Sequence, residues 1–213
     1  MYEFPESRIL LFAKEPVYGR VKTRLHDAIG VEQAFQLHCA MLRYQAKKLQ
    51  DANLAPWEVW VSGDPHNPLL TGMKLPVPLR QQRGHDLGER MWAAAEASLV
   101  GSASVLLVGT DCPSVDVDYL REASRLLRAG SQVVIGPAED GGYVLLGLTR
   151  SVRELFVDMP WGTDKVLQLT LERLEGLGLP FSRLPARWDV DRADDLARLA
   201  ELEPPLDFQL DGS

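Results

Sequence analysis

The sequence has little of what would place it in a specialised class of protein. It contains only two cysteines, Cys39 and Cys112, in 213 residues, so it has no disulfide framework. No apolar run approaches the roughly 18–20 residues that a helix needs to cross a bilayer. It also lacks a Walker loop, a Gly-x-Gly-x-x-Gly fingerprint, a Gly-x-Ser-x-Gly elbow and zinc-ligand spacing. Kinase-like, dinucleotide-binding, serine hydrolase and zinc-enzyme functions therefore lose their main sequence support.

The chain also has fewer basic than acidic residues. The formal net charge is −7 at pH 7 and the sequence pI is near 5.2, which argues against binding to nucleic acid or to an anionic membrane surface. The N-terminus has no secretory pattern, because Glu3, Glu6 and Arg8 precede a short apolar run. We therefore expect a cytoplasmic protein without a membrane span, acting on small molecules. The oligomeric state stays open.

Apolar, strand-like runs alternate with amphipathic helical stretches along the chain. The predicted strands are residues 9–13, 57–62, 77–80, 105–108, 132–135 and 143–148, with an extended piece over 180–190. The predicted helices are residues 31–52, 87–99, 117–127, 164–176 and 192–202. This alternation predicts a single α/β domain over residues 1–203, a three-layer α/β/α sandwich with a mostly parallel central sheet. Residues 204–213 are predicted to form a flexible tail.

A basic loop follows the first predicted strand. It contains four cationic side chains and a glycine within eleven residues. The candidate nucleotide-binding residues in this loop are Lys14, Gly19, Arg20, Lys22 and Arg24. Several cations on one loop can neutralise a diphosphate or triphosphate. A solvated charged loop is the alternative. In a chain this acidic, the cluster favours a phosphate-binding role.

Two acidic segments end apolar runs about eighty positions apart. Asp111 comes directly after the strand at 105–108, where ligands bind at the carboxyl ends of parallel strands. Asp189 and Asp191 project to one side of an extended backbone. Carboxylates suit Mg²⁺ or Mn²⁺, so Asp111 and Asp189 are predicted metal ligands, although Asp111 would also suit a turn. Asp191 is either a further ligand or the N-cap of the last helix.

Two glycine-containing segments are further candidates. Residues 136–143 form either a hairpin turn or a longer insertion, in which Asp140 or Glu139 faces a substrate. Residues 84–90, with Gly84, Asp86 and Arg90, open a helix whose free N–H groups can meet a nucleotide. From pattern alone, a capping box with Asp86 as N-cap and Glu89 three residues later is slightly favoured there.

Together these segments resemble the nucleotide-diphospho-sugar transferase superfamily, which has the GT-A-type fold, and within it small bacterial glycosyltransferase-like proteins of the DUF2064 type. The resemblance runs from about residue 9 to residue 199. It rests on five ordered motifs: Phe12–Leu25, Gln82–Arg90, Gly109–Pro113, Gly136–Tyr143 and Asp189–Leu196. It implies a nucleotide over the carboxyl edge of the sheet and a Mg²⁺ or Mn²⁺ ion on Asp111 and Asp189. It also places residues 84–90 at the base or ribose, and residues 140–143 at the acceptor.

The chain departs from its relatives at two motifs. Residues 13–16 replace the Ala-Gly-Gly loop of many nucleotidyltransferases, and Asp111-Cys112-Pro113 replaces the Asp-x-Asp of many glycosyltransferases. Residues 22–25 also resemble the basic motif of phospholactate guanylyltransferases. The expected function is metal-dependent glycosyl transfer from a nucleoside-diphosphate sugar to a small acceptor, with Asp111 and Asp140 as catalytic residues. The alternatives are guanylyl or cytidylyl transfer from a nucleoside triphosphate with release of pyrophosphate, and a non-catalytic nucleotide-binding module.

Overall fold

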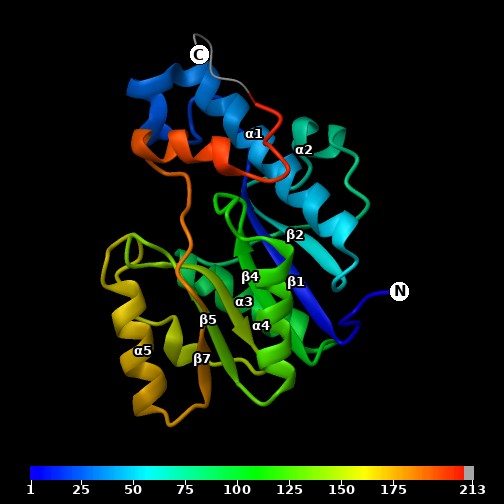
Figure 1. The fold of residues 1–213 in the computed structure, drawn as a ribbon, viewed down its shortest axis with the longest axis vertical. Helices are drawn as coiled ribbons and strands as arrows, with labels where there is room; N and C mark the ends of the chain where they lie inside the picture. The colour runs from blue at the N-terminus through cyan, green and yellow to red at the C-terminus, as the bar shows by residue number, and fades with distance from the viewer. Residues whose placement is uncertain (209–213) are drawn as a thin grey trace.

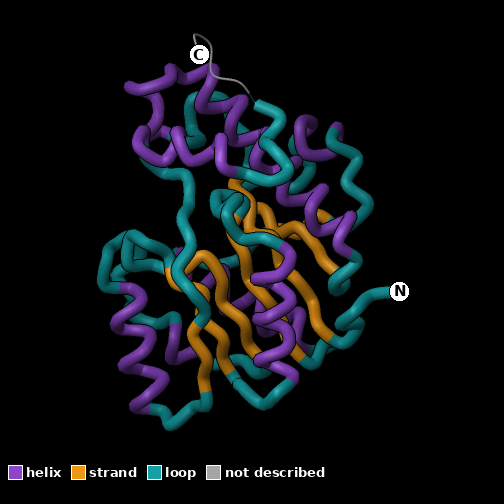
Figure 2. Tube along the Cα trace, viewed as in Figure 1, coloured by secondary structure: helices purple, strands orange, loops and turns teal. Residues whose placement is uncertain are grey.

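Seven strands form one mixed sheet at the centre of the molecule, which is a computed structural model describing residues 1–208 (Figures 1 and 2). The strands are β1 Ser7–Lys14, β2 Trp57–Ser62, β3 Leu79–Gln81, β4 Ser104–Gly109, β5 Val133–Pro137, β6 Tyr143–Leu148 and β7 Phe181–Arg183. Their order in the sheet is β3-β2-β1-β4-β6-β5-β7. Only β6 runs antiparallel to its neighbours. The predicted mostly parallel sheet is therefore confirmed.

Helices cover both faces of this sheet. They are α1 His26–Ala52, α2 Pro68–Gly72, α3 Leu87–Leu99, α4 Val117–Arg128 and α5 Val166–Gly176, with 3-10 turns η1 Thr23–Leu25, η2 Arg153–Leu155 and η3 Ala193–Glu201. The backbone of Gly30 is non-helical (φ 76°, ψ 162°), so the helix predicted from residue 31 is the part of α1 beyond this break. The short helix α2 was not predicted, because five residues that begin with a proline carry too little periodicity.

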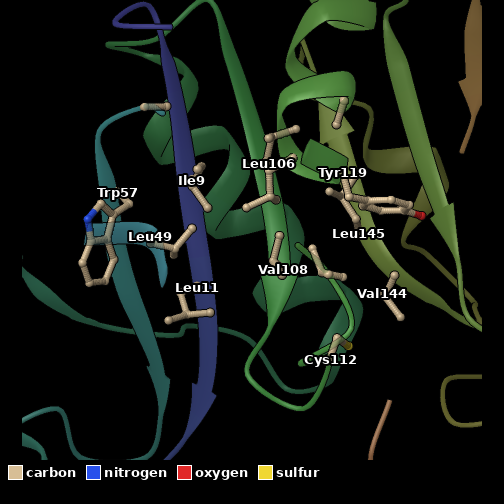
Figure 3. Close-up of a cluster of buried hydrophobic side chains, with 14 of the residues drawn as sticks. Ile9, Leu11, Leu49, Trp57, Leu106, Val108, Cys112, Tyr119, Val144 and Leu145 are labelled. Carbon is tan, nitrogen blue, oxygen red and sulfur yellow. The ribbon is translucent and has the colours of Figure 1, made fainter. Parts of the chain in front are cut away.

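The alternation of side chains along the strands builds the two core layers. On one face, Ile9 and Leu11 of β1 pack with Leu49 of α1 and with residues of α4 (Figure 3). On the other face, Leu10 packs with Met91 of α3 and with residues of α5. Each fully buried aliphatic side chain contributes about 1.5–3 kcal/mol relative to exposure. Both sides of β1 are therefore fixed, and with them the place where the basic loop leaves the sheet.

A third buried cluster holds the second acidic segment in place. Trp188 and Val190 are buried with Leu37 and Met41 of α1. In Figure 1 the C-terminal η3 segment, in orange-red, lies beside α1 at one end of the molecule. Residues 180–190 were predicted to be extended, but the structure limits the strand to β7. Beyond it the chain keeps single backbone contacts with β5, such as Arg187 N to Pro137 O at 2.9 Å.

The described part of the predicted tail packs against the molecule. Leu206 and Phe208 are partly buried against the third cluster, whereas residues 209–213 lie outside the described residues. Among residues 1–208, no helix combines the length and the apolar character that crossing a membrane requires.

Candidate functional site

The two acidic segments meet at the carboxyl edge of the sheet. The backbone N–H of Val190 donates to the carbonyl of Asp111 at 2.9 Å, and the Ser114 hydroxyl donates to the carbonyl of Trp188. One main-chain hydrogen bond and one from a side chain therefore join the turn beyond β4 to the segment before η3. The structure thus brings Asp111, Asp189 and Asp191 into one region, as the sequence predicted for a shared site.

Lys22 lies at the centre of this region. Its ammonium is 2.8 Å from Asp111 Oδ1 and donates to the carbonyl of Val190 at 2.5 Å. The side chain is only 5% exposed, and its backbone adopts the left-handed conformation (φ 49°). Although burial raises the pKa of Asp111, the charge and the hydrogen bond of Lys22 outweigh it and hold that pKa below its usual value. Lys22, which was predicted to bind phosphate, is therefore paired with the carboxylate of Asp111.

Two polar side chains of α1 fix the turn that carries Asp111. Gln45 Nε2 donates to the carbonyl of Cys112 at 2.6 Å. Lys48 Nζ donates to the carbonyls of Pro113 and Val115 at 2.9 and 2.7 Å, and burial lowers its pKa to about 8. The sequence analysis did not identify these positioning residues, because helical spacing alone does not tell which turn a polar residue reaches.

The other cations of the basic loop differ in their availability. Lys14 Nζ donates to the carbonyl of Arg20 at 2.6 Å and so closes the loop on itself. Gly19 has φ 72°, which permits this turn. Arg24 is ion-paired with Asp191. The Arg20 side chain is exposed and, within residues 1–208, forms no ion pair of the kind that holds Lys22 and Arg24, so it is accessible to a phosphate.

The helix start at residues 84–90 is held by its own polar groups. Asp86 is the N-cap of α3 and accepts from the N–H of Glu89 at 2.8 Å, while the Glu89 carboxylate accepts from the N–H of His85 at 2.8 Å. The capping role of Asp86 is therefore confirmed. Arg90 donates to the Gly84 carbonyl at 3.1 Å and also reaches the end of β2, so it anchors this loop. A contact of residues 84–90 with a nucleotide stays a prediction.

The glycine segment at residues 136–143 is the antiparallel β5–β6 hairpin, one of the two predicted alternatives. Asp140 Oδ1 accepts from the N–H of Gly142 at 3.0 Å and stabilises the turn. The neighbouring Glu139 is held by Arg198 at 2.6 and 3.1 Å, and this hydrogen bond lowers the pKa of Glu139. Of the two acidic candidates, Asp140 is thus the one without a cationic partner among the ion pairs of residues 1–208.

Asp189 and Asp191 differ in their surroundings. Burial, followed by the negative charges of Asp140 and Asp191, raises the pKa of Asp189 to about 6. The expectation that Asp191 caps the last helix is wrong, because the N-cap of η3 is Arg192. The capping carboxylate is that of Asp195, which accepts from the N–H groups of Asp191 and Arg192 at 2.9 and 2.7 Å.

Asp140 and Asp189 border two adjoining cavities. The first, of about 220 Å³, lies beside the end of β4, the start of β6 and the start of α3. It is lined by Phe12, Leu87, Met91, Leu107, Val108, Gly109, Cys112, Ala138, Asp140, Gly142, Tyr143, Val144, Trp161, Gly162, Thr163, Val166 and Asp189. Figure 3 shows Cys112 in the turn beyond Val108 and Val144 on the neighbouring strand. The second cavity, of about 400 Å³, is bordered mainly by charged side chains, including Arg24 and Asp191. Two carboxylates therefore stand where an apolar cavity meets a polar one.

The donor set fits a hard divalent cation in type and in charge. Asp111, Asp140 and Asp189 are all close enough to Cys112 that, together with burial, their charges raise the pKa of its thiol. Lys22 is paired with one of these carboxylates, that of Asp111. Carboxylate oxygens are the ligands that Mg²⁺ and Mn²⁺ prefer. Nevertheless, within residues 1–208 no three ligating side chains are gathered into a formed metal site.

Comparisons with known proteins agree with this architecture. The profile of a family described as an uncharacterized protein conserved in bacteria (DUF2064) matches residues 45–163. No curated protein matches the chain. A predicted nucleotide-diphospho-sugar transferase from Desulfovibrio desulfuricans G20 is 31% identical, with a TM-score of 0.83 over 92% of this chain and 86% of that one.

Two more distant solved structures share the fold alone. A cytidylyltransferase from Leptospira borgpetersenii is 17% identical, with a TM-score of 0.59 over 90% of this chain and 84% of that one. A Mycobacterium tuberculosis protein determined in complex with manganese is 16% identical, with a TM-score of 0.55 over 93% of this chain and the whole of that one. These likenesses confirm the predicted fold, and the roles of individual site residues stay predictions.

Proposed function

This chain belongs to the DUF2064 family, and we propose that it is a transferase using a nucleotide-activated donor, which moves a glycosyl group from a nucleoside-diphosphate sugar to a small acceptor. The observation that carries the proposal is the position of Asp140 and Asp189 at the edge of an apolar cavity, beside the Lys22–Asp111 pair. The 31% identical relative, which is named as a putative nucleotide-diphospho-sugar transferase, supports the donor class.

Each part of the site has a role in this proposal. The donor lies over the carboxyl edge of the sheet, where Arg20 and the basic loop contact its phosphates. Asp140 accepts a hydrogen bond from the acceptor hydroxyl and takes its proton as the bond to the sugar forms, which is general base catalysis. Asp111 and Asp189 would hold a divalent ion, which neutralises charge on the departing nucleoside diphosphate when bound.

Nucleotidyl transfer is the second candidate. The motif at residues 22–25, which resembles that of phospholactate guanylyltransferases, and the fold shared with a cytidylyltransferase favour it. In that reaction a phosphate of the acceptor attacks the α-phosphate of a nucleoside triphosphate, and pyrophosphate leaves. The leaving group therefore separates the two reactions.

A ligand panel followed by product analysis tests the proposal. The protein is heated with nucleoside triphosphates, nucleoside diphosphates and sugar nucleotides, each with and without Mn²⁺, because a ligand that binds the native state raises the unfolding temperature. Stabilisation by one sugar nucleotide, and release of its nucleoside diphosphate on addition of an acceptor, are expected. Pyrophosphate release from one triphosphate would establish the second candidate, and tight binding without turnover would indicate a binding module.

Asp111→Ala provides the matched test of the metal. We expect this variant to lose the Mn²⁺-dependent part of the stabilisation and to keep any stabilisation by metal-free nucleotide. If the Mn²⁺ dependence were retained, Asp111 would not be a metal ligand.

A further inference from the structure

Helix α1 carries three polar side chains on the side that packs against the rest of the molecule. His38 and Gln45 are only 3% and 2% exposed, and Lys48 is partly buried. Their spacing of seven and three residues places them on one side of the helix. A polar group buried in this way destabilises the fold unless it makes a hydrogen bond, so the partner of each side chain shows what the helix fixes.

All three side chains donate to main-chain carbonyls at the carboxyl edge of the sheet. His38 Nε2 donates to the carbonyl of Lys14 at 2.9 Å, where β1 ends and the basic loop begins. A carbonyl oxygen can only accept, so this ring nitrogen carries the proton. Gln45 and Lys48 donate to carbonyls of the turn that carries Asp111. One helix therefore fixes the two loops of the site through different side chains.

The effect of His38 on the basic loop is one of position. Burial lowers the pKa of its imidazole, so the ring is uncharged at neutral pH and adds no cation to the loop. The Lys14 ammonium donates in turn to the carbonyl of Arg20 at 2.6 Å. Fixing the main chain at Lys14 therefore also restrains the segment that presents the exposed guanidinium of Arg20.

We propose that α1 positions the two halves of the site separately. His38 is the positioning residue of the basic loop, which binds the diphosphate, and Gln45 is the positioning residue of the Asp111 turn, which binds the metal ion. The assignment of these ligands to the two loops rests on the proposed function. Neither side chain is itself a ligand, because each acts through the carbonyl that it binds. Loss of one should therefore weaken one ligand and spare the other.

Hydrogen exchange of single amides tests the two contacts without any ligand. The Arg20 N–H is hydrogen-bonded within the basic loop, and the Val190 N–H donates to the carbonyl of Asp111 at 2.9 Å. We expect His38→Leu, which removes the donor, to speed exchange at Arg20 by about two- to tenfold, the usual value of one hydrogen bond. Exchange at Val190 should not change. Gln45→Met should show the opposite pattern.

Binding of two simple probes to the whole chain tests the consequence for the site. The probes are Mn²⁺ alone and inorganic pyrophosphate without metal, each followed by titration calorimetry. His38→Leu should weaken pyrophosphate by about two- to tenfold and leave the affinity for Mn²⁺ unchanged. Gln45→Met should weaken Mn²⁺ by about 10- to 100-fold, the usual effect of removing a group that orients a metal ligand. It should leave the affinity for pyrophosphate unchanged.

Three further variants separate positioning from packing. His38→Gln restores an N–H donor of similar reach and should recover the affinity for pyrophosphate. Lys48→Met removes the other donor to the Asp111 turn, so it should weaken Mn²⁺ even if Gln45→Met does not fold. Gln36→Met is the matched control, because Gln36 lies on the exposed side of α1, where it donates to Glu32 at 2.8 Å. It should change neither affinity.

Several outcomes would overturn the proposal. Equal loss of both affinities in either variant would contradict separate positioning, and so would exchange rates that change together. If His38→Gln did not recover the affinity for pyrophosphate, His38 would serve packing alone. If the unchanged protein bound neither Mn²⁺ nor pyrophosphate, the proposed function would fail, and the exchange pattern would still decide whether α1 fixes the two loops separately.

Discussion

The ammonium of Lys22 lies 2.8 Å from Asp111 Oδ1 and 2.5 Å from the carbonyl of Val190, so one lysine joins the two acidic segments of the site. This lysine is paired with one oxygen of Asp111, a carboxylate that a bound metal ion would also use. A metal ion and the Lys22 ammonium therefore compete for the same carboxylate. If the ion wins, the ammonium is released toward the phosphates of the donor.

Lys22→Met should strengthen the binding of Mn²⁺ to the nucleotide-free protein. Removing a positive charge beside a half-exposed carboxylate is worth on the order of 1–2 kcal/mol, or about tenfold in affinity. Titration calorimetry with Mn²⁺ measures this directly. The same variant should bind nucleoside diphosphate more weakly, with little change for the nucleoside.

Lys47→Met is the matched control, because Lys47 forms an exposed pair with Asp51 on α1. It should leave the affinity for Mn²⁺ unchanged. An unchanged affinity in Lys22→Met as well would place the metal away from Asp111.

Asp189→Asn should stabilise the fold at neutral pH. The folded-state pKa of Asp189, about 6, lies above the unfolded value near 3.9. The stability contributed by the protonated carboxyl is therefore complete below about pH 4 and is lost as the pH rises through about 6. Asparagine does not ionise and so avoids this loss. The free energy of unfolding of the variant should therefore exceed that of the unchanged protein by about 1–3 kcal/mol at pH 7.5 and by almost nothing near pH 4. Denaturant unfolding at the two pH values measures the difference.

Asp191→Asn provides the comparison for Asp189→Asn. It removes the ion pair with Arg24 and should not stabilise the fold at pH 7.5. It should also cost less transferase activity than Asp189→Asn. A gain of equal size in the two variants, or one that does not depend on pH, would contradict the assigned environment of Asp189.

Asp140→Asn should lower kcat of the transferase by about 10²–10⁴, the usual contribution of a general base. Asparagine has nearly the same size as aspartate, and its amide oxygen can still accept the hydrogen bond from the Gly142 N–H. The unfolding temperature should therefore change little. Glu139→Gln is its neighbour control, because Glu139 is paired with Arg198. Steady-state kinetics in which Glu139→Gln lost as much kcat as Asp140→Asn would argue against a catalytic role for Asp140.

Gly88→Ala should destabilise the protein although it lies inside a helix. A Cβ at this position would come within 2.6 Å of Trp161 Nε1 and 2.7 Å of the Phe156 carbonyl, and overpacking of this kind costs about 1–3 kcal/mol. Gly176→Ala is the control, because a Cβ there meets nothing within 4 Å and alanine is favoured over glycine in a helix, by at most about 0.5–1 kcal/mol at this last residue of α5. Thermal unfolding should therefore move in opposite directions for the two variants.

Most of the fold could be predicted from local pattern. Helix α3 and strands β2 and β6 have the predicted bounds, because each is marked by its own hydrophobic period and by neighbouring turn residues. The capping role of Asp86 was equally local, since the donor and the acceptor lie three residues apart. The N-cap of η3 was misplaced because Asp191 and Asp195 offer two carboxylates within five residues, and tertiary contacts with Arg24 decide between them.

The sequence by itself determined the order of strands and helices and which carboxylates end buried strands, because both follow from contacts between near neighbours in the chain. Only the tertiary structure decided that Lys22 is buried against Asp111, that Asp140 and Asp189 face one another's charge, and that Tyr143 and Trp161 close one cavity. These relationships join segments tens of residues apart. Their distances and desolvation depend on how the whole chain packs, and no local pattern records them.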